Sequence, residues 1–199
     1  MSTNHLQAYR GSLLHFLADP AFSDNAHAWH EDGLLIVRDG KVEAAGDYAA
    51  LHATLPAGTA VHDYSGKLLM PGFIDTHIHY PQTDIIASPA EGLLPWLETY
   101  TFPMERGFDD PVHAAGVAEF FLDELLRCGT TTAMVYCTVH PQSVDAFFTA
   151  SEARGLRMVA GKVLMDRHCP EYLRDTAESG ARDTETLIQR WHNRGRARR

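Results

Sequence analysis

The sequence of 199 residues has few cysteines and few basic residues. Cys128, Cys137 and Cys169 are odd in number and form no Cys-x-x-Cys pair, which excludes a zinc knuckle, a redox dithiol and a disulfide framework. We therefore expect them to be packing residues. Against 17 Lys and Arg stand 26 Asp and Glu, a net charge of −9, which argues against a nucleic-acid or anionic-membrane surface. Small or neutral partners are expected instead.

Long hydrophobic runs are also absent. No apolar stretch approaches the roughly 20 residues that cross a bilayer, and the N-terminus lacks the basic-then-apolar pattern of a secretory signal. We expect a cytoplasmic protein with no membrane partner. Two zinc-enzyme signatures are missing too: no histidine is followed two residues later by Glu, and His-Glu-x-x-His does not occur. The composition, 45% hydrophobic and 22% charged, is that of an ordinary globular protein.

The N-terminal third of the chain has the pattern of a small β module. Residues 33–46 contain two apolar segments joined by Asp39-Gly40, a pair that favours a tight hairpin because both positions tolerate positive φ. Further strands are predicted near residues 7–14 and 60–69. The core of such a module is thin for independent stability.

After Pro71-Gly72 the pattern changes to strands that alternate with helices. Strands are predicted over residues 73–79, 130–138 and 156–165, and helices over residues 93–100, 111–128, 143–154 and 183–193. This alternation indicates an α/β fold of about three parallel β/α units, and the apolar strands predict a sheet that is covered on both faces.

The strand predicted over residues 73–79 contains the candidate metal-binding residues. Side chains alternate across a strand, so Asp75, His77 and His79 share one face. Two histidines at this spacing have Cα atoms roughly 6–7 Å apart, from where two imidazoles can converge on one metal ion. Asp75 could orient such a ligand. In a chain with 12 histidines a His-x-His pair alone is a weak signal, and the alternative is a surface pair that binds nothing.

The residues around this strand resemble a known family. Pro71-Gly72-Phe73-Ile74-Asp75-Thr76-His77-Ile78-His79 looks like the first-strand signature of the amidohydrolase superfamily, metal-dependent hydrolases with a (β/α)8 barrel beside a small β-sandwich. The continuation resembles the guanine deaminase branch of that superfamily. It comprises Tyr80-Pro81-Gln82, Leu94-Pro95-Trp96-Leu97-Glu98, Gly129-Thr130-Thr131-Thr132-Ala133, His140-Pro141-Gln142-Ser143 and Gly161-Lys162-Val163-Leu164-Met165-Asp166.

The resemblance implies a zinc cofactor and a purine substrate. It makes His77 and His79 zinc ligands and places His79, Tyr80, Pro81 and Gln82 along the substrate pocket, with Asp75 behind the ligands. The implied reaction is hydrolytic deamination of guanine to xanthine and ammonia. Gln82 is the best candidate for purine recognition because its amide both donates and accepts hydrogen bonds; the alternative is a loop glutamine that faces water. His140, His168 and Asp166 follow predicted strands and could complete a site, although loop roles are the simpler interpretation.

The chain differs from this family in its length. A (β/α)8 barrel takes about 250 residues, so we expect a small β-sandwich-type module over residues 1–70 and only the first part of a (β/α)8 TIM barrel over residues 71–199. Relatives supply two more histidines, an aspartate and the acid-base glutamate from later strands, and a homodimer is implied for full-length relatives only. We expect the isolated chain to fold poorly and to lack deaminase activity. The alternatives are another deaminase or chlorohydrolase of the superfamily, and a non-catalytic metal-binding fragment.

Overall fold

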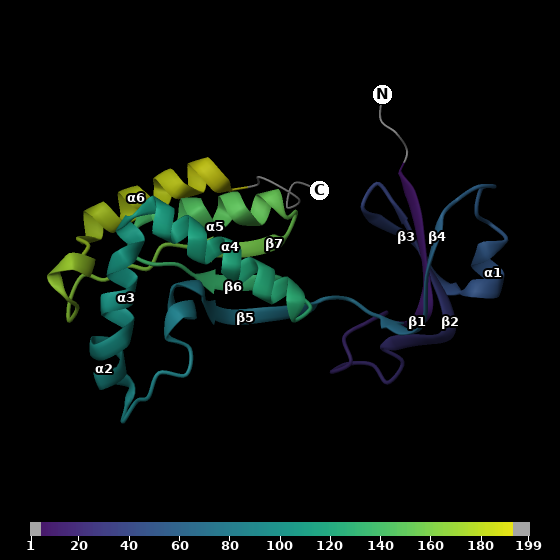
Figure 1. The fold of residues 1–199 in the computed structure, drawn as a ribbon, viewed down its shortest axis with the longest axis horizontal. Helices are drawn as coiled ribbons and strands as arrows, with labels where there is room; N and C mark the ends of the chain where they lie inside the picture. The colour runs from purple at the N-terminus through teal and green to yellow at the C-terminus, as the bar shows by residue number, and fades with distance from the viewer. Residues whose placement is uncertain (1–4, 193–199) are drawn as a thin grey trace. The chain divides into compact units, whose positions relative to one another are not determined.

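The computed structural model describes residues 5–192 (Figure 1). The chain divides into two compact units, Met1–Pro71 and Gly72–Arg199. Each unit has a sheet of its own, four-stranded in the first and three-stranded in the second. The end of the expected barrel segment, beyond residue 192, lies outside the described residues. Over the described part, no helix is long and apolar enough to span a membrane.

The first unit is a single mixed sheet in the order β3-β2-β1-β4. Its strands are β1 (Leu6–Phe16), β2 (His27–Arg38), β3 (Lys41–Asp47) and β4 (Val61–Leu69), and the short helix α1 (Tyr48–His52) follows β3. β1 pairs with β4 in parallel, and the other pairs are antiparallel. The predicted hairpin is confirmed: β2 and β3 are joined at Asp39 and Gly40, whose φ angles are 50° and 75°.

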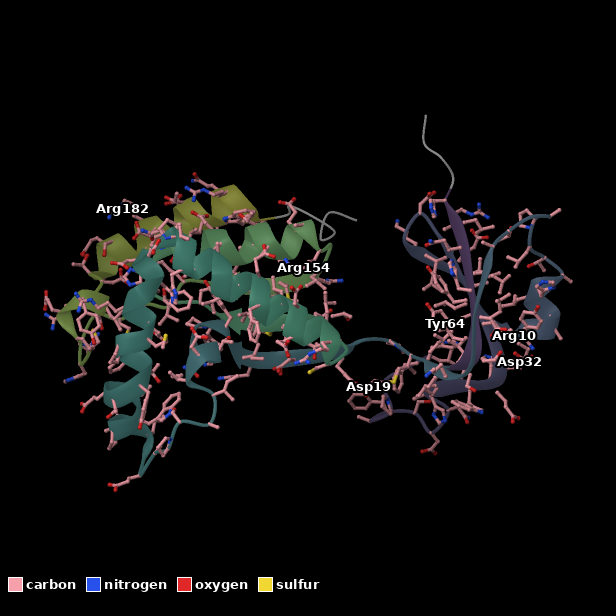
Figure 2. All side chains as sticks on the ribbon, viewed as in Figure 1. Arg10, Asp19, Asp32, Tyr64, Arg154 and Arg182 are labelled. Atoms are coloured by element: carbon pink, nitrogen blue, oxygen red, sulfur yellow. The ribbon has the colours of Figure 1, made fainter. Side chains whose placement is uncertain are left out.

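The core of this unit is small, as its composition predicts. Ala8, Leu34 and Ile36 are buried, and a ring of half-buried apolar side chains surrounds them. Arg10 adds a polar contact, because it forms two hydrogen bonds of 2.7 and 2.8 Å with Asp32 and lies 3.9 Å above the Tyr48 ring (Figure 2). The residues described here form one sheet, so the sandwich-type module stays a prediction.

The second unit is built around a parallel sheet in the order β5-β6-β7. Its strands are β5 (Phe73–His79), β6 (Thr130–Tyr136) and β7 (Arg157–Gly161), and its longer helices are α4 (Pro111–Arg127), α5 (Pro141–Ala153) and α6 (Ala177–Trp191). The helix α4 begins at the predicted residue because the Asp110 carboxylate accepts a hydrogen bond from the Val112 N–H and Pro111 fits the first turn. The alternation of strands and helices is therefore confirmed.

Within residues 5–192, helices cover one face of the sheet, whereas the apolar strands predicted cover on both faces. The residues Ala133 and Val135 of β6 are buried in a core that contains Phe121 and Phe147 of helices α4 and α5. Their neighbours on the other face, Met134 and Tyr136, are 48% and 43% exposed. In Figure 1, α4, α5 and α6 all lie on one side of this sheet. The apolar composition of the strands predicted that their side chains are buried. Successive side chains of a strand point to opposite faces, so only those on the face toward the helices are buried.

Three predicted elements differ in extent. The helix α6 begins at Ala177, six residues before its predicted start, because Thr176 and Ser179 form a capping box. The strand β7 ends at Gly161 instead of 165, where Lys162 turns to pair with Asp175 at 2.6 Å. Where one helix was expected over 93–100, three helical segments follow one another.

These three segments are α2 (Leu93–Trp96), the π-helical turn η2 (Leu97–Thr101) and α3 (Phe102–Arg106), and the 3-10 turn η3 (Gly107–Asp109) comes after them. The π-helical turn precedes Pro103, whose nitrogen donates no hydrogen bond to the preceding turn. The result is a continuous helical arm that leads toward α4.

Candidate active site

The two histidines of β5 converge at the carboxyl end of that strand. The Nε2 atoms of His77 and His79 are 3.4 Å apart. Both rings pack on Tyr136, at the corresponding end of β6, with centroid distances of 4.9 and 4.5 Å. Burial lowers the pKa of His79, and the neighbouring His77 lowers it further, so the neutral ring that binds metals is favoured. Sequence reasoning did not identify Tyr136, which lies 57 residues beyond His79 in the chain.

Asp75 acts on the backbone of this strand. Its Oδ1 accepts a hydrogen bond of 2.9 Å from the His77 N–H, and orientation of an imidazole ring by Asp75 stays a prediction. The pairing of β5 with β6 is irregular between Asp75 and Ile78. An irregularity of this kind turns the side chains that follow it, and this one lies beside the histidines.

Tyr80 and Pro81 are placed differently from the expectation. Both are buried, at the start of the 3-10 helix η1 (Tyr80–Ile85). The Tyr80 ring is fully enclosed among Phe108, Phe121 and Phe147, and its hydroxyl donates a 2.6 Å hydrogen bond to the Ser143 carbonyl oxygen. The side chain of Tyr80 therefore packs in the core and does not line the pocket.

Gln82 and His79 line one cavity of about 340 Å³. The helical arm contributes Thr101 and Glu105 to the same cavity, and the segment after β7 contributes residues 163–169. A purine base fits a volume of this size, which lies at the lower end of the range for small-molecule sites. Polar groups from three separated parts of the chain therefore meet at this cavity.

Glu105 has the most perturbed environment of these residues. It is 4% exposed, and its Oε2 has no hydrogen-bond partner among the residues described. Burial raises the pKa of the Glu105 carboxyl from 4.5 to about 7. A buried carboxyl group without a partner destabilises the folded state when it is ionised. No motif indicated this residue; only burial reveals it.

This raised pKa predicts a pH-dependent effect on stability. Between about pH 4.5 and pH 7 the unfolded chain has lost the Glu105 proton while the folded chain keeps it, so stability falls as pH rises. Above pH 7 the full penalty applies, on the order of 3 kcal/mol. We expect Glu105→Gln to match the wild type in unfolding free energy near pH 4.5 and to exceed it at pH 8, measured by urea unfolding of the full-length protein.

The matched control is Glu98→Gln, at an exposed glutamate of η2. This variant should leave the pH profile unchanged. If Glu105→Gln proved less stable than the wild type at pH 8, the carboxylate would have a stabilising partner and the expectation would be wrong.

Of the other residues that could complete a site, Asp166 and His168 line the same cavity as His79, and His140 does not. His140 precedes α5, its Nε2 is buried without a partner in the described chain, and burial lowers its pKa. His168 is exposed, lines the cavity and has a positive φ of 52°. Asp166 pairs with Arg167 through two 2.7 Å hydrogen bonds. Of the three cysteines expected to be packing residues, only Cys137 is buried; Cys128 is exposed and Cys169 lines the cavity.

The histidine pair fits a metal ion as part of a ligand set. Two ligands on one tetrahedral zinc, each at about 2.05 Å, lie about 3.3 Å apart, close to the 3.4 Å between the Nε2 atoms. A catalytic zinc needs at least three protein ligands. Within residues 5–192, no group of three or more His, Cys, Asp or Glu side chains is arranged to hold a metal. His77 and His79 therefore form an incomplete set.

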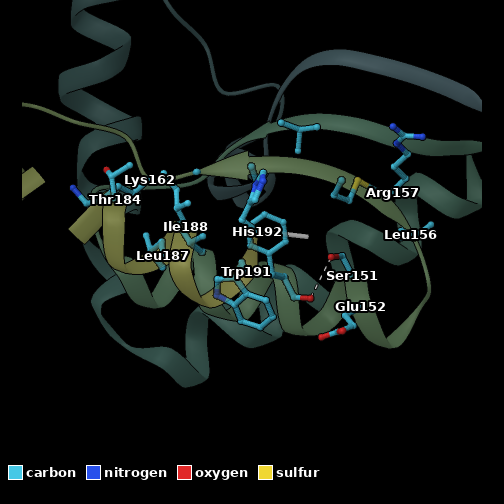
Figure 3. A pocket seen from close by; sticks show the side chains of 16 residues that line it. Ser151, Glu152, Leu156, Arg157, Lys162, Thr184, Leu187, Ile188, Trp191 and His192 are labelled. Carbon is cyan, nitrogen blue, oxygen red and sulfur yellow. Dashed lines mark hydrogen bonds between the residues drawn. The ribbon is translucent and has the colours of Figure 1, made fainter. Parts of the chain in front are cut away.

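A larger cavity, of about 480 Å³, is lined by neither His77 nor His79 (Figure 3). It is lined by β7, α5 and α6, and apolar side chains such as Phe148, Leu187 and Ile188 dominate it. Neither His77 nor Gln82 contributes to it. In the described part of the chain, the strand β7 has a neighbour on one side only, so this cavity lies beside an open sheet edge.

Known proteins resemble the chain in sequence and in structure. A guanine deaminase of Escherichia coli (strain K12) is 48% identical over 98% of this chain and 46% of its own length. The E. coli guanine deaminase structure superposes with a TM-score of 0.90, and that of guanine deaminase from Bradyrhizobium japonicum, 35% identical, with 0.91; each match covers 96% of this chain and, respectively, 45% and 42% of the other. Guanine deaminase from C. acetobutylicum with bound guanine is 27% identical, with a TM-score of 0.82, over 96% of this chain and 44% of its own.

These matches define what the chain shares with its relatives. It spans about half the length of the curated relatives that it matches. Residues 68–197, which include the histidine strand and the cavity, match the amidohydrolase family. The convergent histidines at the end of β5 and this match over about two thirds of the sequence agree: the chain belongs to the amidohydrolase family.

Proposed function

We propose that this chain forms the first part of a zinc-dependent guanine deaminase, which hydrolyses guanine to xanthine and ammonia. The observation that carries the proposal is the 3.4 Å separation of the His77 and His79 Nε2 atoms beside a cavity that His79 shares with Gln82. The similarity to three guanine deaminase structures over 96% of the chain supports it. The parallel sheet would then be the first part of a (β/α)8 barrel, with the histidines at its carboxyl end.

His77 and His79 would hold the zinc ion. When bound, zinc supplies Lewis acidity that makes a water molecule nucleophilic near neutral pH. The chain's part is to hold the two rings side by side: Tyr136 packs against both, and Asp75 holds the His77 backbone. The remaining ligands and the acid-base glutamate are expected outside the described residues.

Gln82 would orient the substrate. Its amide offers one donor and one acceptor group to the polar edge of guanine, and η1 holds it at the cavity beside His79. The buried Tyr80 and Pro81 anchor the start of η1 in the core, so they support the pocket from behind. A cytoplasmic location and a homodimer of the full-length protein belong to the same proposal.

The proposal is tested by a substrate panel on the full-length protein loaded with zinc. We expect ammonia release from guanine with formation of xanthine, and at most slow reaction with adenine, cytosine or a chlorotriazine. Gln82→Ala should raise KM for guanine roughly 10–100-fold because a hydrogen-bonding pair is lost. Gln189→Ala, at an exposed position of α6, is the matched control and should have no effect.

Each other outcome identifies an alternative. Dechlorination of the triazine in preference to guanine would indicate a chlorohydrolase, and faster reaction with adenine or cytosine would indicate another deaminase. Zinc binding without turnover of any substrate would indicate a non-catalytic metal-binding protein.

A further inference from the structure

Glu105 lines the cavity and is a buried carboxyl group that lacks a hydrogen-bond partner at one oxygen. Its side chain is 4% exposed, and its Oε2 is enclosed without a hydrogen-bond partner in the described structure. Buried carboxyl groups in native proteins almost always have a partner, and those without one are costly to the fold. A group of this kind at a cavity indicates that its partner arrives from elsewhere.

A second unpartnered group lies on the same helical arm. The Oγ1 of Thr101 is buried, also has no partner in the described part of the chain, and its residue lines the same cavity as Glu105. Thr101 ends the π-helical turn η2 and Glu105 belongs to the adjoining helix α3. This arm therefore contributes two residues with unpartnered buried oxygens to the lining of the cavity that Gln82 and His79 also line.

The arginine of the cavity lining, Arg167, and the arginine next to Glu105 in the chain, Arg106, both contact other groups. Arg167, the basic residue of the cavity lining besides histidine, makes two 2.7 Å hydrogen bonds with Asp166. Arg106, the next residue along α3, lies over the Tyr172 ring at 5.1 Å. The cavity lining also contains His79, His168 and Cys169, and none of them is hydrogen-bonded to Oε2 of Glu105. Within residues 5–192, Oε2 of Glu105 therefore has no protein partner.

The chemistry of a carboxylate defines which ligand group it takes. An ionised carboxylate only accepts hydrogen bonds, so the ligand must present an N–H or O–H group. A free purine base has such groups on its rings: guanine carries N–H at N1 and on the imidazole ring. Given the proposed function, on which this step rests, we infer that Glu105 is a specificity-determining residue that accepts a hydrogen bond from a ring N–H of the purine. Thr101 lines the same cavity.

The test uses Glu105→Gln and Glu105→Met in the full-length protein, with Glu98→Gln as the exposed control. Guanine binding is measured by calorimetry, KM and kcat by ammonia release, and Tm at pH 8. We expect Glu105→Gln to weaken guanine binding roughly 10–100-fold, the range for a charge-assisted hydrogen bond, and Glu105→Met to weaken it at least as much. Tm should rise in both variants, because the unpaired buried charge is gone.

Methylated substrates identify the hydrogen involved. 1-Methylguanine lacks the N1 hydrogen, and 9-methylguanine lacks the N9 hydrogen. The analogue that lacks the bonded hydrogen should bind weakly to the wild type and lose little more affinity in Glu105→Gln. Methylation and the Glu105→Gln substitution each lower the binding affinity by some factor. If the combined factor equals the product of the two for both analogues, the effects are independent. Glu105 then contacts neither hydrogen and the inference is overturned.

Two further outcomes separate this inference from the proposed function. If the wild type binds and deaminates guanine but Glu105→Gln binds it equally well, the inference fails while the proposed function stands. A fall in Tm would also overturn the inference, because it would show that Glu105 pairs with a cation of the protein itself. If the wild type neither binds nor deaminates guanine, both fail together.

Discussion

Replacement of His77 or His79 by alanine is expected to remove zinc from the full-length protein and to lower guanine deamination at least roughly 10³-fold. The two Nε2 atoms are 3.4 Å apart, and in the proposed function each ring would supply one ligand to the same ion. Loss of one ligand opens the coordination shell and removes the geometry that catalysis requires. Zinc content by elemental analysis and the rate of ammonia release measure the two effects.

The matched control is His27→Ala, at an exposed histidine of β2. This variant should keep its zinc and its activity. A variant of His77 or His79 that retained stoichiometric zinc and half of the wild-type rate would show that the pair does not hold the catalytic metal.

The 199-residue chain expressed by itself is expected to aggregate and to release no ammonia from guanine above the rate of its own His77→Ala, His79→Ala double variant. Activity fails because two histidines are an incomplete ligand set, and the part of the chain from 5 to 192 contains no larger one. Ammonia release and elution from a size-exclusion column measure the prediction.

The surface of the second unit explains the expected aggregation. Ile74 of β5 and Val159 of β7 are 69% and 55% exposed. In the described chain β7 presents an unpaired edge beside the apolar cavity of about 480 Å³. An exposed apolar edge pairs with other chains. A monomeric preparation that deaminates guanine faster than the double variant would contradict this prediction.

Several elements could be predicted because their signals are local. The turn at Asp39-Gly40 and the cap formed by Asp110 with Pro111 depend on residues next to one another, so the sequence shows them directly. The cap of α6 is local too, but it uses Ser179 where glutamate or glutamine is usual, and the predicted start was late.

The histidine strand was also predictable, although the roles of its neighbours were not. The spacing of His77 and His79 indicated convergence, and their Nε2 atoms do converge. Tyr80 follows them directly, yet the chain turns into η1 at this residue and the ring packs into the core. Adjacency along the chain does not decide the direction of a side chain once a strand ends.

By itself the sequence determined the hairpin of the first unit, the alternation of strands and helices in the second, the convergent histidines and the family to which the chain belongs, because periodicity, turn residues and motif spacing are properties of neighbouring positions. The tertiary structure alone decided which face of the β5-β6-β7 sheet is buried, that Tyr136 packs on the His79 ring, and that Thr101 and Glu105 line the cavity of His79 and Gln82. These residues lie on separate elements, and burial and the absence of a partner are properties of the space around a side chain. No motif records them.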